Sequence, residues 1–398
     1  MDHLSRRRFL KALGVGAGAA LGTRLGGPGF MGRAMAATPE PTTVVAIFLN
    51  GGINAIFTGA DSFMGTAFGV TANNTTAMGP VIIDNAIANA IPMNVRNRVA
   101  TVGIRHGISD HGNAQRSLFV DQGRSAPLTL ANAIGGNGAI KAAVVGGNGL
   151  PGGGAPQPVN GVSLQAITDM RATIDAVAGA APAPNTVDRE GAPKGLAAAQ
   201  AMSNRGIGKN KGSLASVEQG FPAAIATLQK PVQPFNVQEF NTAYNINGTA
   251  VNNFAGRMAA AELMVRSGCN FVIAQDQGWD SHGDTQGNNV RNMVTQRIAP
   301  GLRTFLTRMV DGASAERNVV VVLFGDFHRS LPGSDHQANL SALVIGKTVK
   351  NATTGKTDAR VGLPAGTPGI QGFWQFLGAA AKVDQNPFGA NPHTALMA

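Results

Sequence analysis

The sequence has 398 residues, of which 43% are hydrophobic and 14% are charged, and it contains 53 glycines. This apolar composition is typical of a globular protein with a large core and excludes a disordered chain. The formal net charge is +10, but residues 1–36 hold six basic side chains and one acidic, which leaves 26 basic and 21 acidic residues beyond them. Without a basic run that carries aromatic side chains, this small excess indicates no nucleic-acid partner.

The N-terminus has the layout of an export signal. Arginines at Arg6, Arg7 and Arg8 precede an apolar run over residues 12–22, and Ala34-Met35-Ala36 follows as a cleavage motif. We interpret residues 1–36 as a twin-arginine signal peptide, read by the twin-arginine export machinery. The alternative is a membrane anchor, but the run is too short to span a bilayer. We therefore expect a periplasmic or extracellular protein with no stable membrane span after cleavage.

The remaining chain alternates between strand and helix patterns. Strands are predicted at residues 43–49, 99–104, 142–145, 270–274, 318–324 and 342–345. Helices are predicted at residues 113–122, 258–266 and 371–381, and apolar residues recur in helical steps from Val290 to Met309. This order predicts one α/β domain over residues 37–398, with a mainly parallel sheet and helices on both faces.

Two segments depart from this alternation. The chain turns polar at about residues 181–250, which we expect to be an insertion with helices at Leu196–Met202 and Phe221–Gln229. Residues 146–154 form a glycine-rich loop after a strand. The loop lacks the lysine and hydroxyl of a phosphate-binding loop, so no nucleotide cofactor is expected and the loop is interpreted as a flexible connection or lid.

Four histidines lie within two residues of an aspartate, close to expected strand ends. Residues i and i+2 of an extended segment face the same side, so the first two of these pairs can each face one site. The pairs are Asp280 with His282, Asp326 with His328, Asp335 with His336, and Asp110 with His111. Imidazole and carboxylate are ligands for a divalent metal such as zinc, manganese, iron or calcium. Alternatively, each aspartate orients a histidine, or each histidine caps a loop.

Other polar residues have two interpretations each. Ser109 lies near an expected helix start, where it is either a nucleophile or a helix cap. Arg329, like Arg105 and Arg116, is either a ligand for an anionic group or a surface charge. Around the first metal pair, Asp276 and Asp284 are expected to be solvated or to support the ligands. Trp279 is expected to pack and to fix the turn.

Several motifs together resemble the twin-arginine-exported bacterial DUF1501 family, a domain-of-unknown-function family similar to the alkaline phosphatase and sulfatase superfamily. The motifs are Phe48-Leu49-Asn50-Gly51-Gly52, His111-Gly112-Asn113-Ala114-Gln115, Trp279-Asp280-Ser281-His282-Gly283, Asp326-Phe327-His328-Arg329 and Asp335-His336. The resemblance covers nearly the whole mature chain. It implies an alkaline phosphatase-like three-layer sandwich whose enzymes hydrolyse phosphate or sulfate esters with bound divalent metals.

The resemblance also implies roles for individual residues. Metal ligands are expected among Asp280, His282, Asp326, His328, Asp335 and His336, and catalytic groups among Ser109, His111 and Arg329. An anionic ester is the expected substrate. The chain has Asn54 where the family usually has an acid, which removes a ligand that a second metal would need. A non-catalytic binding or cell-surface protein on the same fold is the alternative.

Overall fold

The computed structural model describes residues 42–66, 68–136, 138–177, 236–311 and 317–398, together with residues 194, 195, 197, 198 and 201. The expected signal peptide and the helix expected at Phe221–Gln229 lie outside these residues, and the helix expected at Leu196–Met202 lies largely outside them.

An eight-stranded sheet forms the centre of the described structure, in the order β15-β5-β14-β11-β1-β10-β8-β9. β14 runs antiparallel to its neighbours β11 and β5, and the other pairings are parallel. The strands are β1 (Thr42–Leu49), β5 (Val99–Ile104), β8 (Ala142–Val145), β9 (Leu164–Ile167), β10 (Phe271–Asp276), β11 (Asn318–Gly325), β14 (Leu340–Ile345) and β15 (Ala352–Thr353). The expectation of a mainly parallel α/β sheet is confirmed.

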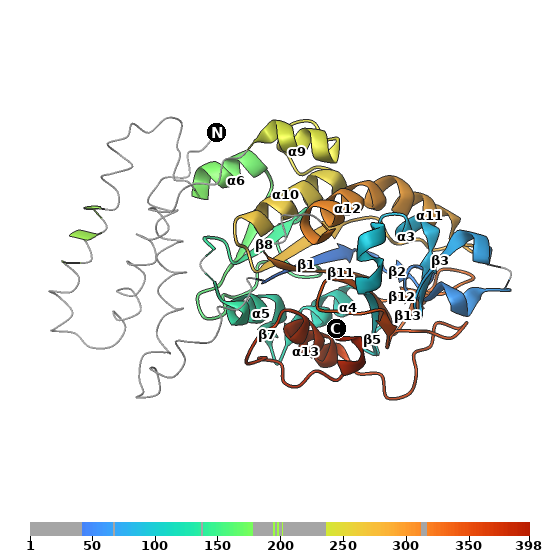
Figure 1. Ribbon diagram of the computed structural model, residues 1–398. Coiled ribbons are helices and arrows are strands. Elements are labelled where there is room, and N and C mark those ends of the chain that lie inside the picture. Colours follow the sequence, from blue (N-terminus) through green and yellow to red (C-terminus); the bar gives the residue numbers. More distant parts are fainter. Residues whose placement is uncertain are drawn as a thin grey trace. The chain divides into compact units, whose positions relative to one another are not determined.

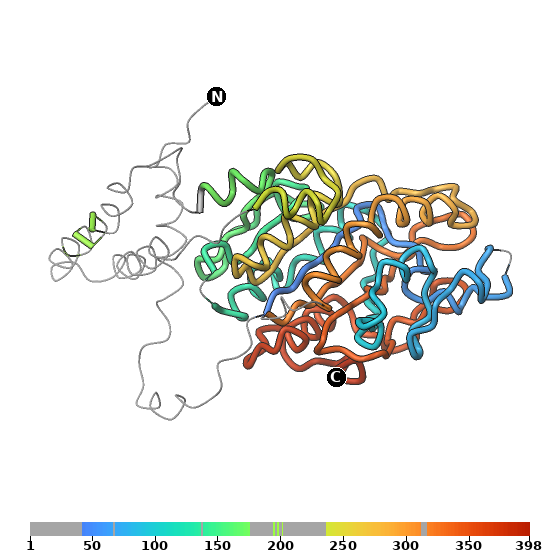
Figure 2. The backbone as a smooth tube through the Cα atoms, turned by 45° about the horizontal axis from the view of Figure 1, so that its top comes forward, coloured from blue at the N-terminus to red at the C-terminus, as the bar shows by residue number. Residues whose placement is uncertain are grey.

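β1 is the first strand along the chain but lies inside the sheet, between two strands from the C-terminal half of the chain. Val44 pairs with Phe271 of β10 on one side and with Val320 of β11 on the other. Figure 2 shows the blue tube of β1 running between these later segments. All eight residues of β1 and all eight of β11 are buried, as expected for parallel strands covered on both faces.

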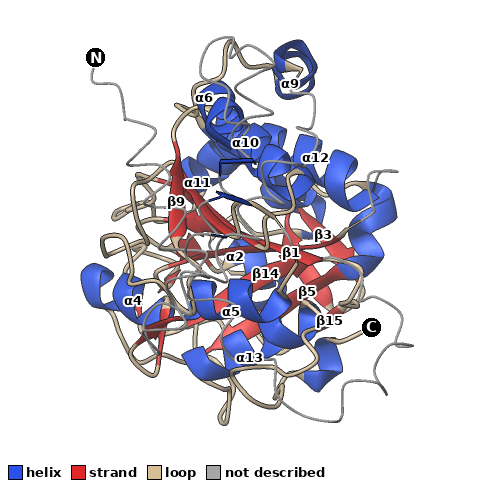
Figure 3. Cartoon of the chain, turned by 90° about the vertical axis from the view of Figure 1, so that its left-hand side faces the viewer, coloured by secondary structure: helices blue, strands red, loops and turns tan. Residues whose placement is uncertain are grey.

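Helices cover both faces of the sheet (Figures 1 and 3). α10 (Phe254–Arg266) and α12 (Ala299–Leu306) lie on one face, and α5 (Ala126–Ile134) and α13 (Ile370–Ala380) lie on the other. α4 (His111–Leu118) lies beside α13, whose Trp374 donates its indole N–H to the carbonyl of Leu118 at 2.9 Å. This arrangement leaves the carboxyl ends of the parallel strands free to carry loops.

The helical steps predicted from Val290 to Met309 form one helical stretch. It runs through α11 (Asn288–Met293), a π-helical turn η5 (Val294–Ile298), α12, and a second π-helical turn η6 (Thr307–Asp311). Pro300 has no backbone N–H to give to the preceding turn, which accounts for the wider turn before it. The expected apolar face is buried, except that Met293 is half-buried.

Shorter elements complete the described structure. A three-stranded sheet joins β13 (His336–Gln337), β12 (His328–Arg329) and β2 (Ile53–Asn54). Two hairpins are β3 (Thr75–Met78) with β4 (Val81–Asp84), and β6 (Val120–Asp121) with β7 (Arg124–Ser125). The remaining helices are α2 (Ile56–Gly59), η2 (Ala60–Phe63), η3 (Ala72–Asn74), α3 (Asn85–Ala88), η4 (Met93–Arg98), α6 (Met170–Val177), α9 (Val237–Tyr244) and η7 (Thr394–Leu396).

The chain divides into two compact units. One comprises residues 40–156, 164–170 and 236–398, and it holds the eight-stranded sheet and every candidate site residue. The other comprises residues 1–39, 157–163 and 171–235, and its described part includes a bridge between Val159 and Val162. Among the helices that the structure describes, none has both the length and the apolar composition that crossing a membrane requires.

Candidate metal centre

A cluster of histidines and carboxylates lies at the carboxyl edge of the sheet. β1, β5, β10 and β11 all end at this edge, and β14 begins there because it runs in the opposite direction. The cluster consists of His111, Asp280, His282, Asp326, Arg329 and His336, all supplied by the segments that follow or precede these strands. The two strand ends predicted from sequence to form one site therefore meet, and the segment after β5 contributes as well.

His111 is the first residue of α4, and the helix start holds its position. Asp110 caps the helix by accepting a hydrogen bond from the backbone N–H of Asn113 at 2.8 Å. The Nδ1 atom of His111 lies 2.6 Å from Oδ2 of Asp326. This contact leaves Nε2 of His111 facing Asp280, whose Oδ2 is 3.9 Å away. Nη2 of Arg329 also lies 3.5 Å from this Nε2, a long contact that a bound metal ion would replace. A carboxylate on the other ring nitrogen is the usual arrangement of a metal-binding histidine.

Asp326 is held so that it can orient His111. It directly follows β11, and its side chain is fully buried. Its Oδ1 accepts the backbone N–H of Gly51 at 3.1 Å, and its Oδ2 accepts the side-chain amide of Gln115 at 2.8 Å. These donors compensate for the loss of water around the carboxylate. Asp326 therefore supports a ligand, and its oxygens are already engaged by protein donors.

His336 is anchored through Nδ1 and presents its other ring nitrogen to the cluster. Its Nδ1 donates to the backbone carbonyl of Ser109 at 2.7 Å, which places the proton of the neutral ring on Nδ1 and leaves Nε2 with a lone pair. Burial lowers the pKa of His336 and outweighs the hydrogen bond to Ser109, which raises it. Its ring packs against that of Phe327, with centroids 4.3 Å apart. The neutral, anchored ring is a suitable metal ligand.

Asp280 and His282 complete the cluster from the loop after β10. The predicted same-side arrangement is present, because Nε2 of His282 lies 3.4 Å from Oδ1 of Asp280. The same Nε2 lies 2.9 Å from Nε2 of His336. Both side chains are about half exposed, with 54% and 51% of their surface accessible. The cluster is therefore open to solvent and to a ligand.

The donor atoms fit one divalent ion after small movements. One ligand atom each from His111, Asp280 and His336 lies within 4.8 Å of the other two. Two ligands about 2.1 Å from one zinc ion are separated by about 3.0 Å at a right angle and by at most about 4.2 Å. The 2.9 Å and 3.4 Å distances of His282 already lie in this range. The set is three histidines and one carboxylate, which suits zinc or manganese.

The charges around the cluster also favour a cation. Three carboxylates, those of Asp280, Asp326 and Asp335, face a single guanidinium, that of Arg329. The excess of negative charge lies on the side chains closest to the free ring nitrogens. A bound divalent cation would offset this excess, and the fully buried Asp326 makes the effect stronger than at an exposed site.

Arg329 connects the segments of the site. Its side chain is only 1% exposed, and it donates to the carbonyls of Gly51 and Ser334 and to Oδ1 of Asp280, the last at 2.7 Å. Burial lowers the pKa of Arg329, and the Asp280 carboxylate opposes that shift. Because all three of its nitrogens donate to protein acceptors, Arg329 positions Asp280 and is not free to hold an anionic group by itself.

Three residues predicted for the site are placed differently. Ser109 is exposed and reaches the cluster through its carbonyl, while its hydroxyl makes no hydrogen bond with the described residues. Asp335 is 73% exposed and approaches only His282, at 3.8 Å. His328 is fully buried, and its Nε2 accepts the N–H of Ser341 at 2.9 Å. Its segment turns away after Asp326 to join the three-stranded sheet, so the structure does not bring His328 into the cluster.

Trp279 and two buried aspartates near it support the loop that follows β10. Trp279 is 1% exposed and donates to Asp276 at 2.8 Å, which confirms that it packs and fixes the turn. Asp276 is buried between Arg257 and Arg297, each 2.6 Å away, so the expectation that it is solvated is wrong. Asp284 is also buried, and accepts the N–H of Val290 at 3.0 Å at the start of α11.

Two contributors to the site were not predicted as site residues. Gln115 bridges Asp326 and Asn50, and Gly51 brings its backbone N–H to Asp326. Gln115 lies four residues after His111, so both fall on one face of α4, and this spacing could have identified it. Asn54 uses its side-chain oxygen to accept the N–H of Ile56 at 3.2 Å, and it does not join the cluster.

Comparison with known proteins gives one match. A family model described as "Protein of unknown function (DUF1501)" matches residues 152–365. The matched region includes Asp280, His282, Asp326, Arg329 and His336, whereas His111 and Gly51 precede it. Searches of curated proteins and of solved structures returned no significant match.

Proposed function

The chain belongs to the DUF1501 family, whose description gives no activity, and we propose from the site itself that it is a metal-dependent hydrolase of phosphate or sulfate esters. The observation that carries this proposal is the pair of anchored histidines. His111 and His336 each have Nδ1 engaged by a protein oxygen, and each presents Nε2 toward the space beside Asp280.

In this proposal, His111, Asp280, His282 and His336 hold one divalent ion. A bound ion of this kind polarises an ester oxygen and lowers the pKa of water. Asp326 keeps His111 in the orientation and tautomer that binding requires, because its oxygens accept from His111, Gln115 and Gly51. Arg329 holds Asp280 in place and adds positive charge beside an anionic substrate.

Among the residues that the structure describes, no hydroxyl is poised at the cluster to attack an ester. Ser281 and Ser334 are bonded to each other, with their oxygens 2.8 Å apart, and the hydroxyl of Ser109 is unbonded among the described residues. We therefore assign the attack on the ester to water. The predicted role of Ser109 as nucleophile becomes the less supported alternative.

The wider proposal combines this site with the sequence. The mainly parallel sheet covered by helices on both faces supports an alkaline phosphatase-like sandwich. The layout of residues 1–36 supports export through the twin-arginine machinery to the periplasm or beyond. Proteins exported by this route cross the membrane folded, which fits a site assembled before export.

A second candidate is a non-catalytic binding protein on the same fold. The observation that favours it is the absence, among the described residues, of a serine or threonine hydroxyl bonded to the cluster. In this case the site would hold a ligand or a metal and turn over no ester.

The decisive experiment measures metal and turnover on the mature protein, exported and purified without chelator. We expect about one equivalent of zinc or manganese per chain, and hydrolysis of 4-nitrophenyl phosphate or sulfate that chelator abolishes and metal restores. Asp280→Ala and His336→Ala should each lower the metal content and the activity strongly. Asp384→Ala is the matched control, because that aspartate is exposed and unpaired among the described residues.

The outcomes of this experiment distinguish the metal-dependent hydrolase from the non-catalytic binding protein. Wild-type protein with less than about half an equivalent of any divalent metal would reject the metal centre. Full metal content without turnover of either ester class would reject the hydrolase and favour the binding protein.

A further inference from the structure

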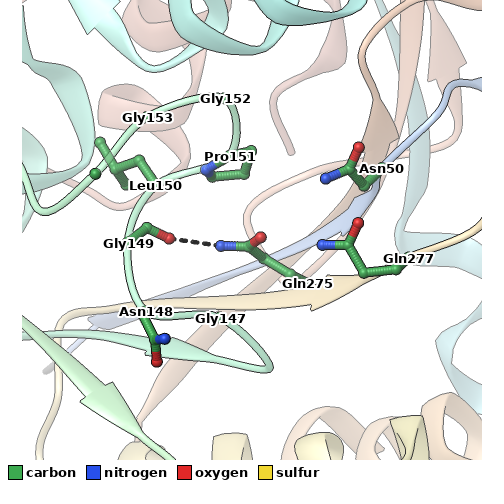
Figure 4. A pocket seen from close by; sticks show the side chains of 11 residues that line it. Asn50, Gly147, Asn148, Gly149, Leu150, Pro151, Gly152, Gly153, Gln275 and Gln277 are labelled. Atoms are coloured by element: carbon green, nitrogen blue, oxygen red, sulfur yellow. Dashed lines mark hydrogen bonds between the residues drawn. The ribbon is translucent and has the colours of Figure 1, made fainter.

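A second feature of the same sheet edge is a polar pocket of about 340 Å³ (Figure 4). The glycine-rich loop that follows β8 forms one wall, and the ends of β1 and β10 form the other. Asn50, Gln275 and Gln277 point their side chains from the strand ends toward this loop, as Figure 4 shows. This volume lies at the small end of the range typical of ligand pockets, about 300–1,000 Å³.

The lining of the pocket has a distinct chemistry. It contains no charged and no aromatic side chain, and its polar groups are side-chain amides and the backbone of glycines. The amides of Asn148 and Gln277 make no hydrogen bond with other described residues, so both remain free to donate and to accept. Leu150 and Pro151 add a small apolar surface. This set fits a neutral ligand whose own groups both donate and accept hydrogen bonds.

The loop packs against the strand ends, while its expected role as a flexible connection or lid stays a prediction. The carbonyl of Gly149 accepts the side-chain amide of Gln275 at 2.6 Å. A Cβ at Gly147 would lie 2.8 Å from Nε2 of Gln275, and a Cβ at Gly152 would lie 2.5 Å from Cβ of Gln115. At Gly152 the overlap is with the Cβ of Gln115 and φ is +68°, so glycine is needed there, whereas at Gly147 the nearest atom is the movable end of Gln275.

The pocket is connected to the metal cluster through one side chain. Asn50 lines the pocket, and its Oδ1 accepts from Gln115 at 2.7 Å. Gln115 also donates to Asp326, the partner of His111. On the other wall, Gln277 lies three residues before Asp280 in the same loop. The pocket and the proposed centre are thus joined through the hydrogen bonds of Gln115.

A neighbouring pocket of about 350 Å³ shares Gly147 and Asn148 with the first. Its other lining residues include Thr168, Asn252 and Arg257. The shared residues make the two pockets adjacent across the loop, so a ligand longer than one small ring finds polar groups on both sides.

From this lining we propose that the glycine-loop pocket, together with its neighbour, binds a neutral saccharide, which forms the alcohol part of the ester. Sugar hydroxyls both donate and accept, as the free amides require. Only the attachment of this saccharide to a phosphate or sulfate rests on the proposed function. The binding of the neutral part does not.

The test measures neutral disaccharides (maltose, cellobiose and diacetylchitobiose) by calorimetry against the mature full-length protein in chelator. We expect at least one of them to bind without metal. The double variant Asn148→Ala/Gln277→Ala should bind about tenfold more weakly.

Asn289→Ala is the control, because this exposed amide on α11 lies outside the pocket. It should bind as the wild type does. The proposal is overturned if none of the disaccharides binds at millimolar concentration, or if the double variant binds as tightly as the control. Ester hydrolysis without disaccharide binding would reject the pocket alone, whereas disaccharide binding without hydrolysis would keep the pocket and reject the hydrolase.

Discussion

At the scale of single residues, the site depends on the hydrogen bonds that hold its metal ligands in place. Asp326 accepts from three donors, those of His111, Gln115 and Gly51. Asp326→Asn replaces one acceptor oxygen with a donor nitrogen, so at least one of these donors loses its partner. We expect metal affinity to fall by about 10- to 100-fold, as for other partners of metal-binding histidines. The free energy of unfolding should fall by about 1–3 kcal/mol.

Competition with a chromogenic chelator measures the affinity, and urea unfolding measures the stability. Asp384→Asn is the control, since that aspartate is exposed and unpaired among the described residues. A folded Asp326→Asn protein with unchanged metal affinity would show that Asp326 does not orient a metal ligand.

Sequence spacing predicted one aspartate–histidine pair well and another poorly. Asp280 and His282 do face one site, with Nε2 of His282 3.4 Å from Oδ1 of Asp280, although His282 already lies in a turn. Asp326 and His328 have the same spacing, but His328 pairs with Ile53 in the three-stranded sheet and lies away from the cluster. The spacing alone therefore does not decide whether such a pair shares a site, because the backbone beyond the end of a strand is not regular.

At the scale of elements, the site needs the turn after β1 to touch the loop after β10. Gly51 has a φ of +123°, and a Cβ there would lie 2.3 Å from the backbone nitrogen of Asp280 and 2.5 Å from the carbonyl carbon of Trp279. Any side chain would separate the two segments. The same turn donates to Asp326 and accepts from Arg329, so a displacement would disturb the whole cluster.

We therefore expect Gly51→Ala to lower the free energy of unfolding by more than about 2 kcal/mol, since it combines steric overlap with a left-handed backbone. Metal binding should be lost with it. Gly153→Ala is the matched control, because a Cβ at that position meets no atom within 4 Å and its φ lies outside the left-handed region. Urea unfolding of both variants checks this, and equal stabilities would contradict the close approach of the two segments.

Elements differ in how far the sequence predicts them. The long buried strands, such as β1 and β11, have continuous β-branched runs and were placed within two residues. The hairpin of β3 and β4 was missed, because residues 71–76 are polar and half exposed and resemble a turn. β15 has two residues, too few for any periodicity to show.

At the scale of the whole molecule, the direction of β14 was not predictable from its apolar pattern alone. No crossover helix lies in the segment between β11 and β14, which instead forms the short strands β12 and β13. A parallel neighbour is usually reached through a crossover helix; this segment is long enough for one but forms two short strands, and β14 enters the sheet antiparallel. Its first residue then lies at the carboxyl edge of the other strands, and this direction brings His336 to the cluster.

The whole fold should also lose stability in acid through its buried histidines. Burial lowers the pKa of His106 to about 4, that of His328 to about 3 and that of His393 to about 4. In the unfolded chain a histidine has a pKa of about 6.5, so below that pH the unfolded chain binds more protons than the folded protein. The stabilisation is complete above about pH 6.5 and is lost as the pH falls toward the folded values.

His393 gives the cleanest test because it is 1% exposed and lies in the C-terminal segment, outside the cluster. Each such histidine contributes a slope of at most about 1.4 kcal/mol per pH unit to the free energy of unfolding. His393→Asn removes one titrating group and keeps a side chain able to bond with Thr354, which lies 2.8 Å from Nδ1 of His393. Urea unfolding between about pH 6 and 4.5 should then show a slope shallower by about 1 kcal/mol per pH unit. An unchanged slope would mean that this ring takes up its proton without unfolding, and that the acid sensitivity of the fold arises elsewhere.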